Sequence, residues 1–327
     1  MKKIILLAIC ISTLLFSACK VDFSPNAEWK EIPVVYCILD QDEDTIWARI
    51  QRCYLVDGKI TEPAKISDSI NFPKGYLKVD MVSIKGSEVR DSFHFTYDTI
   101  TIDDGSFANV SQPMYYCVPS QRLDSTCTFK LIVSRAATGE ILAEATTQLV
   151  SCSYDELLYV RFGRPIFSFY DPGDQYNPQW YNFKNARRYE PIVRFYYGEG
   201  DDTLYADLSC GDMIEDLTTQ IQTISYSRYH FLSDLKNALK DDPATKKYLK
   251  FVDIFITACN EDLNAYINSS DITSIEQSHN TYSNISGGGI GIFGSRRTHL
   301  KQRIPADSAN GPGSLFVEIL KLDLNFD

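Results

Sequence analysis

The sequence is poor in histidine and in the short motifs that mark catalytic and metal sites. It has 4 histidines among 327 residues, and it contains no H-E-x-x-H, G-x-S-x-G or C-x-x-C motif. These absences remove the usual sequence evidence for a zinc protease, an α/β-hydrolase, a structural zinc site or a thioredoxin-type redox centre. The sequence therefore predicts no metal and no catalytic residue.

Positive charge is also scarce. The chain has 32 Lys and Arg against 43 Asp and Glu, which gives a net charge of −11. Because an acidic surface repels phosphate backbones, a nucleic-acid partner is not expected. After the first twenty residues, no apolar run is long enough to cross a bilayer as a helix.

The first nineteen residues have the features of a bacterial lipoprotein signal. Lys2 and Lys3 precede an apolar run at 4–16, and a small pair of residues then precedes Cys19. This pattern predicts a signal peptide at 1–18, with acylation of Cys19 on its thiol and on the amine that cleavage frees. Several acyl chains hold a protein to a membrane much more firmly than one chain. The alternative is an ordinary secretory signal that happens to contain a cysteine.

The residues after Cys19 favour the outer membrane. Lys20 occupies the place where an aspartate would indicate retention in the inner membrane, and the nearby Asp22 favours export to the surface. Residues 19–30 are predicted to form a lipidated tether. The periplasmic and cell-surface faces both stay open, and outer-membrane lipid is the predicted partner of the acylated Cys19.

Residues 31–152 are predicted to form an immunoglobulin-like β-sandwich. Seven short segments rich in β-branched and aromatic residues alternate with turn sequences such as "DQDED" and "IKGSE". Trp47 is a candidate for the core of this sandwich. The alternation around Trp47 does not decide which face is buried.

Residues 153–327 are predicted to form a second β-rich domain with one or two short helices, so the fold class is mainly β. Leucines recur at helical spacing in residues 228–242, and "EDLNAYINSS" at 261–270 predicts a shorter helix. The remaining apolar segments predict strands at 157–162, 190–198, 203–208, 250–260 and 315–324.

The cysteines of the mature chain allow a disulfide. Seven remain after the signal peptide and Cys19 are set aside, so at least one is unpaired. The segment "MYYCVPSQRLDSTCTFKLIV" is typical of a hairpin that places Cys117 opposite Cys127, which predicts a disulfide between them. The alternative is two separately buried thiols.

Two motifs resemble cofactor or metal sites only in part. Gly289, Gly291 and Gly294 spell G-x-G-x-x-G, but no buried strand precedes them and no helix follows them, so no dinucleotide cofactor is expected. The glycines are better explained by positive φ angles or by close approach of another segment. The acidic stretch at 40–44 lacks the glycine and the glutamate of a calcium loop, so a solvated turn is predicted there.

Residues 252–297 carry a family resemblance. With the lipoprotein signal, the stretches "VDIFITACNEDLNAYI" and "YSNISGGGIGIFGSRR" (motif 284–297) resemble the Bacteroidota lipoproteins catalogued as domain of unknown function 4249. The resemblance implies an outer-membrane lipoprotein, often found beside TonB-dependent receptors, with no established activity. The matching positions are Tyr282, Asn284, Gly289, Gly291, Phe293 and Gly294.

An aromatic segment at 169–190 offers candidate contact residues. Aromatic side chains on turn-rich segments stack on sugars or anchor protein partners. The candidates for contact with a ligand or partner are Tyr176, Trp180, Tyr181, Arg187 and Arg188. The alternative, which composition favours, is that the rings fill the core of the second domain.

These observations predict a non-catalytic outer-membrane accessory that binds a glycan or peptide ligand or a partner such as a TonB-dependent receptor. No cofactor is expected. Two alternatives stay open: a glycan hydrolase that uses carboxylates of the second domain, and an adhesin or structural component that assembles by strand addition.

Overall fold

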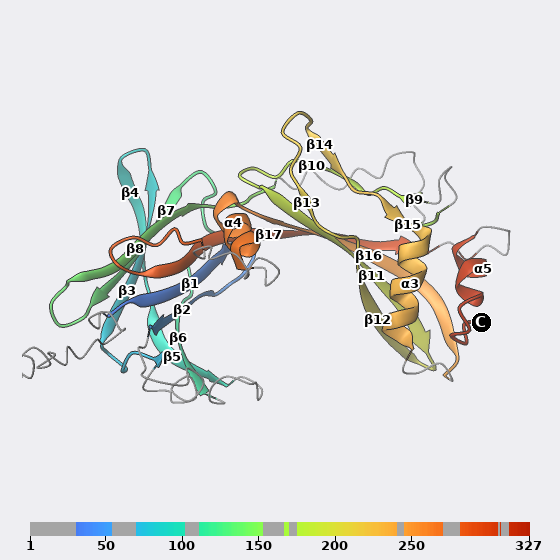
Figure 1. Cartoon of the computed structure of the whole chain (residues 1–327), viewed down its shortest axis with the longest axis horizontal. Helices are drawn as coiled ribbons and strands as arrows, with labels where there is room; N and C mark the ends of the chain where they lie inside the picture. The colour runs from blue at the N-terminus through green and yellow to red at the C-terminus, as the bar shows by residue number, and fades with distance from the viewer. Residues whose placement is uncertain are drawn as a thin grey trace, which may run out of the picture.

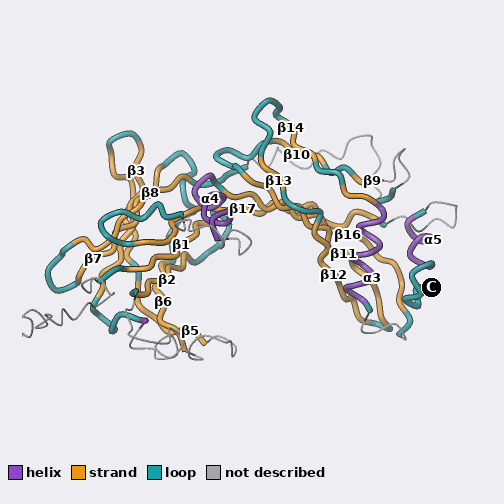
Figure 2. Tube along the Cα trace, viewed as in Figure 1, coloured by secondary structure: helices purple, strands orange, loops and turns teal. Residues whose placement is uncertain are grey.

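The computed structural model describes residues 31–53, 70–101, 111–152, 167–169, 175–240, 245–270, 282–306, 308 and 314–327, and all structural statements concern these residues. The fold is mainly β, as predicted, with 54% strand and 13% helix (Figures 1 and 2). The signal peptide, Cys19, the tether and the strand predicted at 157–162 lie outside the described residues. Within the described residues, no helix has the length and apolar character needed to cross a bilayer.

The N-terminal lobe is a β-sandwich. One sheet includes β1 (Pro33–Asp40), β2 (Ile46–Arg52), β6 (Ser111–Cys117) and β5 (Thr96–Thr101). The other has the order β4 (Glu88–His94), β3 (Leu77–Lys85), β7 (Thr128–Arg135) and β8 (Ile141–Gln148). One of the seven segments predicted as strands, "FHFTYDTITI" at 93–102, instead divides between the two sheets, because β4 pairs with β3 and β5 pairs with β6.

Alternating side chains on β1 and β2 build the sandwich core. Val35, Cys37 and Leu39 point inward from β1 and are almost completely buried. The prediction for Trp47 is wrong, since this side chain is 39% exposed and packs against Tyr116 on the outer face. The smaller neighbours of Trp47 on β2 face the core instead, which settles the face that the alternation left open.

The larger sheet continues from the sandwich into the C-terminal lobe. Its strand order is β12-β11-β16-β17-β1-β2-β6-β5, and the continuous path is visible in Figure 1. Strand β17 (Ile290–Pro305) pairs in parallel with β1 over residues 290–296 and antiparallel with β16 (Lys247–Cys259) over residues 296–305. A segment from the second predicted domain therefore places Phe293 in the core of the sandwich.

The C-terminal lobe packs helix α3 (Arg228–Leu239) and aromatic loops onto the other half of this sheet. That half also contains β11 (Arg188–Glu199), β12 (Asp202–Ser209) and β13 (Met213–Ile214). Two small sheets pair β10 (Gln179–Tyr181) with β14 (Ile221–Thr223) and β9 (Gln175–Tyr176) with β15 (Tyr226–Ser227). The core is rich in aromatic rings, including Phe195, Phe231 and Phe167.

Both predicted helices form, but one predicted strand is a helix instead. Helices α3 and α4 (Glu261–Ser270) form where they are predicted. The strand predicted at 315–324 is wrong, because this segment begins with helix α5 (Leu315–Leu320). Ser314 caps α5 by accepting a hydrogen bond of 3.3 Å from the Val317 amide, and Leu315 and Ile319 bury one helical face.

Candidate functional site

A groove with a volume of about 460 Å³ lies where the sandwich meets the C-terminal lobe. Strands β7 and β8 supply one wall, the loop before β11 supplies a second, and the start of α4 supplies a third. The lining residues are Thr128, Thr146, Thr147, Gln148, Asn185, Ala186, Asn260, Glu261 and Asp262. Apart from Ala186, all of these side chains are hydroxyls, amides or carboxylates.

Asn260 fixes the three chain segments that meet at this groove. It is 5% exposed and stands immediately before α4, where its Oδ1 accepts hydrogen bonds from the Leu263 amide at 3.1 Å and the Ser295 amide at 3.2 Å. Its Nδ2 donates to Thr147 Oγ1 at 2.8 Å. Asparagine is favoured as a helix cap because its side-chain oxygen satisfies a free amide of the first turn. One side chain thus joins α4, β17 and β8.

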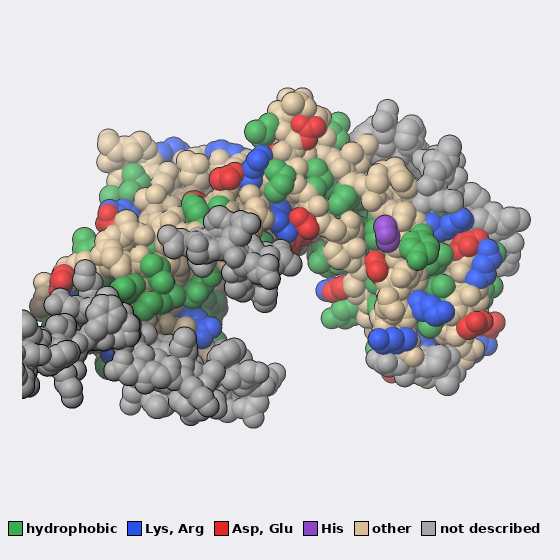
Figure 3. Space-filling model, viewed as in Figure 1, with side chains coloured by type: hydrophobic (Ala, Val, Ile, Leu, Met, Phe, Trp, Pro, Cys, Tyr) green, Lys and Arg blue, Asp and Glu red, His purple; other side chains and the backbone are tan. Residues whose placement is uncertain are grey.

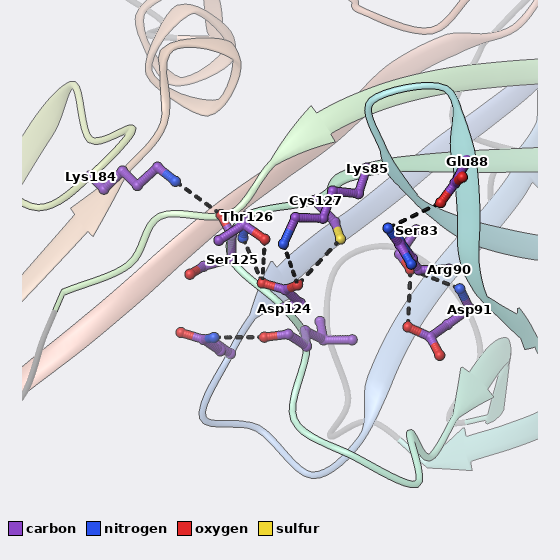
Figure 4. A network of polar contacts seen from close by, with 12 residues as sticks. Ser83, Lys85, Glu88, Arg90, Asp91, Asp124, Ser125, Thr126, Cys127 and Lys184 are labelled. Atoms are coloured by element: carbon purple, nitrogen blue, oxygen red, sulfur yellow. Dashed lines mark hydrogen bonds and ion pairs between the residues drawn. The ribbon is translucent and has the colours of Figure 1, made fainter.

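The loop before β11 is held against the sandwich by backbone and side-chain hydrogen bonds. Lys184 and Ser151 exchange two backbone hydrogen bonds of 2.8 and 3.1 Å, and the Asn185 side chain donates to the Leu149 carbonyl at 2.9 Å. Asn185 has a φ of 61°, a left-handed conformation that asparagine tolerates. Lys184 also reaches the Ser125 carbonyl at 3.4 Å (Figure 4). These bonds fix the second wall of the groove.

The α4 wall carries the two carboxylates of the groove. Glu261 is 71% exposed and forms an ion pair with Arg187 at 3.0 Å. Asp262 accepts a hydrogen bond of 2.5 Å from the hydroxyl of Tyr282. Burial, with a further contribution from Asp262, raises the pKa of Tyr282 to about 12, so this tyrosine stays a hydrogen-bond donor. Carboxylates are also favoured at the first turn of a helix by its dipole.

The two carboxylates do not have the arrangement that glycoside hydrolysis needs. Glu261 and Asp262 are consecutive residues on one helix and lie on one wall, and the other lining residues of the groove bring no acid opposite them. Retaining and inverting mechanisms both require two carboxyl groups on either side of the scissile bond. The described lining residues of the groove therefore do not supply the pair that either mechanism uses.

Asp42 in the acidic stretch at 40–44 forms ion pairs with two arginines. Asp42 accepts hydrogen bonds from Arg122 at 2.6 Å and contacts Arg297 at 3.0 Å. The Arg297 side chain is only 3% exposed. Its guanidinium also donates hydrogen bonds to the side-chain oxygen of Gln41 at 2.6 Å and to the sulfur of Cys152 at 3.1 Å. In the described part of the chain, no group of three or more His, Cys, Asp or Glu residues could hold a metal ion.

The predicted aromatic contact surface is mostly core. Trp180 is 1% exposed and packs against Tyr189, and Tyr176 is also buried, so these two candidates fill the core, as the favoured alternative predicts, and are not available to a ligand. They are buried because the small sheets of β9, β10, β14 and β15 fold them over the larger sheet. Tyr181 is partly exposed. Arg188 is engaged by Asp212 at 2.9 Å, which leaves Arg187 as the candidate nearest to the groove.

The glycine motif supports the packing of strand β17, as predicted. Gly291 has a φ of 120° and faces Val35 on β1, while a Cβ on Gly289 would lie 2.8 Å from that of Ala143. A Cβ on Gly294 would meet Leu263 of α4 at 3.1 Å. Beside these glycines, Asn284 exchanges hydrogen bonds of 2.8 and 3.0 Å with the backbone of Phe293. The motif therefore brings β1, β8 and α4 close to β17.

The disulfide prediction is wrong. Cys117 and Cys127 are both free, and the expected hairpin does not form because β6 pairs with β2 and β5 while β7 pairs with β3 and β8. The sulfur of Cys127 instead lies 3.6 Å from a carboxylate oxygen of Asp124 (Figure 4). The alternative of two buried thiols describes both residues.

Comparison with protein-family models gives no match for this chain, and comparison with curated proteins also gives none. The family resemblance thus stays a prediction based on residues 252–297. Sequence reasoning missed the groove, whose lining residues are separated by up to 134 positions of the chain. One signal was present: an asparagine directly before "EDL" is typical of a helix start.

Proposed function

We propose that the protein is a lipid-anchored accessory of the outer membrane that binds a polar ligand in the groove without transforming it. The lipoprotein signal ending at Cys19 supports the anchor. The groove supports the binding role, because its walls present hydroxyl, amide and carboxylate groups without a histidine or cysteine to act as base or nucleophile.

The observation that carries this proposal is the fixed position of the groove's polar side chains. Asn260, Asn185 and Asp262 are each held by hydrogen bonds to a different part of the chain. A binding site whose groups are already ordered loses little conformational entropy when a ligand binds. The carboxylates of Glu261 and Asp262 favour a ligand that is neutral or positively charged.

A tryptophan at position 146 tests the groove. Thr146 is exposed on β8 and lines the groove, so Thr146→Trp fills the space with a large ring. Thr99→Trp, at an exposed position on β5, is the matched control. The full lipidated chain in mild detergent is titrated with saccharides and with peptides while NMR shifts are followed. We expect any ligand to lose at least tenfold in affinity for T146W and to keep its affinity for T99W. Equal affinity for the two variants contradicts the proposal.

The anchor has a separate test. The intact mass of the protein from membranes is expected to include diacylglycerol and acyl additions at Cys19, and Cys19→Ser is expected to move the protein into the aqueous phase of a detergent partition. An unmodified sulfur contradicts this part of the proposal.

The receptor association is implied by the family resemblance and is tested by gentle purification from membranes. We expect a TonB-dependent receptor to accompany the wild-type protein. Its absence from the purified material would remove the receptor from the proposal and leave the groove in place.

A further inference from the structure

Strand β8 forms an edge of the four-stranded sheet of the sandwich. The sheet has the order β4-β3-β7-β8, so only β7 pairs with β8 along its length. The backbone groups of β8 that point away from β7 are therefore not used within the sheet. Such groups are a template for another strand.

The hydrogen bonds of Glu144 show which groups these are. Glu144 donates its amide to the Ser286 carbonyl at 3.0 Å and accepts from the Ser286 amide at 2.8 Å, so its backbone points away from β7. In an antiparallel pair, every second residue points its amide and carbonyl to the same side. The amides and carbonyls of Thr146 and Gln148 therefore also point outward. Among the described residues, no hydrogen bond is found for these four groups.

The same two residues line the groove, so space is present beside the free edge. The chain segment that pairs with Glu144 does not continue along β8. Before Ser286, Ile285 packs against the sandwich core, and Asn284 turns to the backbone of Phe293. The pairing at Ser286 shows that this edge accepts a strand, and the groove begins where that pairing stops.

The other edge of this sheet is protected in the usual way. Strand β4 carries charged side chains, including Glu88 and Arg90, which form an ion pair at 3.0 Å. Charged residues on an edge strand discourage pairing with a second chain. The outer edge of β8 carries the neutral side chains of Thr146 and Gln148 at the groove, which present no such barrier.

The opposite wall of the groove determines the charge of the occupant. Glu261 is largely exposed, and its contact with Arg187 is through Oε2. Asp262 stands beside it on the same wall, and the whole chain carries a net charge of −11. A lysine or arginine of an added strand therefore finds complementary charge across the groove.

From these observations we infer that the β8 edge at Thr146 and Gln148 binds an extended, basic segment of a partner polypeptide as an added strand. The backbone of the segment exchanges hydrogen bonds with Thr146 and Gln148, and its basic side chains face Glu261 and Asp262. This inference rests on the proposed role of the groove as the binding site.

Hydrogen exchange on the full lipidated chain tests the edge directly. The probe is a synthetic octapeptide that alternates threonine with lysine. The control is the same peptide with N-methyl groups on alternate backbone amides, which cannot donate hydrogen bonds at those positions. In the free protein, we expect the amides of Thr146 and Gln148 to exchange at least a hundredfold faster than those of Ala145 and Thr147, which face β7. Saturation with the octapeptide is expected to slow the two outward amides at least tenfold. The N-methylated peptide is expected to bind at least tenfold more weakly.

Charge variants test the opposite wall. Glu261→Gln is expected to lower the affinity for the octapeptide about threefold to tenfold. Glu88→Gln, on the protected edge strand β4, is expected to leave this affinity unchanged. A peptide that binds without slowing exchange at Thr146 and Gln148 overturns the inference, as does equal binding of the N-methylated peptide. A saccharide could instead bind the wild-type groove, fail to bind T146W and leave the amides of Thr146 and Gln148 unprotected. That result overturns strand addition but not the proposed function of the groove. An octapeptide that binds T146W as tightly as T99W counts against the groove itself and so against the proposed function.

Discussion

Gly291 and Val35 lie opposite each other in the parallel pair of β17 and β1, and a Cβ on Gly291 would lie 2.1 Å from the Val35 carbonyl oxygen. The φ of Gly291 is 120°, a conformation that residues with a side chain rarely adopt. Two separate constraints thus require glycine at this position.

Gly291→Ala is expected to lower the free energy of unfolding by about 2–6 kcal/mol, because backbone strain and overpacking each contribute about 1–3 kcal/mol. Gly288→Ala is the matched control. Gly288 also has a positive φ, of 104°, but a Cβ there meets nothing within 4 Å, so only the strain of about 1–3 kcal/mol is expected. Urea denaturation of both variants measures the difference. Similar losses for the two would show that the close approach to Val35 costs nothing.

Asp42→Ala is expected to destabilise the protein by about 1–3 kcal/mol, the usual cost of leaving a buried polar group without its partner, because the buried guanidinium of Arg297 then loses its carboxylate. Arg122 is half exposed and also contacts Asp42, so Arg122→Ala is expected to cost less than about 1 kcal/mol. Denaturation of the single and double variants measures the coupling. If Arg122→Ala lowers the free energy of unfolding more than Asp42→Ala does, then the main role of Asp42 is not to pair with the buried Arg297.

The cysteines are expected to react with thiol reagents in an order set by burial. Burial raises the pKa of Cys37 to about 12, so this thiol carries almost no reactive thiolate near neutral pH. Cys53 and Cys152 are only partly buried and are expected to be alkylated first in the native protein. After unfolding without a reductant, Cys117 and Cys127 should both take up the reagent, as mass spectrometry of the labelled peptides would show. If Cys117 and Cys127 are instead recovered as a disulfide-linked pair of peptides, the disulfide predicted from the sequence is present after all.

Asp124 is expected to make stability depend on acid pH. Hydrogen bonds from the Thr126 amide and hydroxyl hold the pKa of this carboxyl below its usual value of 3.8. Its contribution is therefore present above about pH 4 and is lost as the pH falls through the lowered pKa. Since Asp124 is about half exposed, the effect is less than about 1 kcal/mol. Urea midpoints of wild type and Asp124→Asn should differ at pH 6 and converge near pH 2. A constant difference over this range would argue against ionisation as its cause.

Local patterns in the sequence predict the elements whose signal is itself local. The alternation in β1 and the leucine spacing in α3 are sufficient to place both. Strand β17 is not found in this way, because its 16 residues include charged positions at 296 and 297 and its two halves belong to different pairings. Helix α5 is concealed because its buried pair, Leu315 and Ile319, lies within "LFVEILKLDL", a segment rich in apolar residues that also suits a strand.

The groove and the buried Trp180 depend on contacts between distant segments. Thr147 and Asn260 are 113 positions apart, and no pattern within either segment indicates that they meet. Trp180 lies in a polar, turn-rich sequence and is buried where β14 pairs with β10 and where Tyr189 of β11 packs against its ring. Burial of this kind is a property of topology, which a single sequence without its sheet order does not supply.

Strand β17 has a consequence for the order in which the chain becomes folded. A ribosome makes residues 33–40 long before residues 290–296, yet β1 needs both β2 and β17 as neighbours. Until the residues of β17 are made, the backbone groups of β1 that face β17 have no strand to pair with. The core of the sandwich also lacks the side chain of Phe293. Completion of the first lobe therefore waits for synthesis of almost the entire polypeptide, and a nascent fragment that stops short of residue 290 has an open flank available to any neighbouring strand.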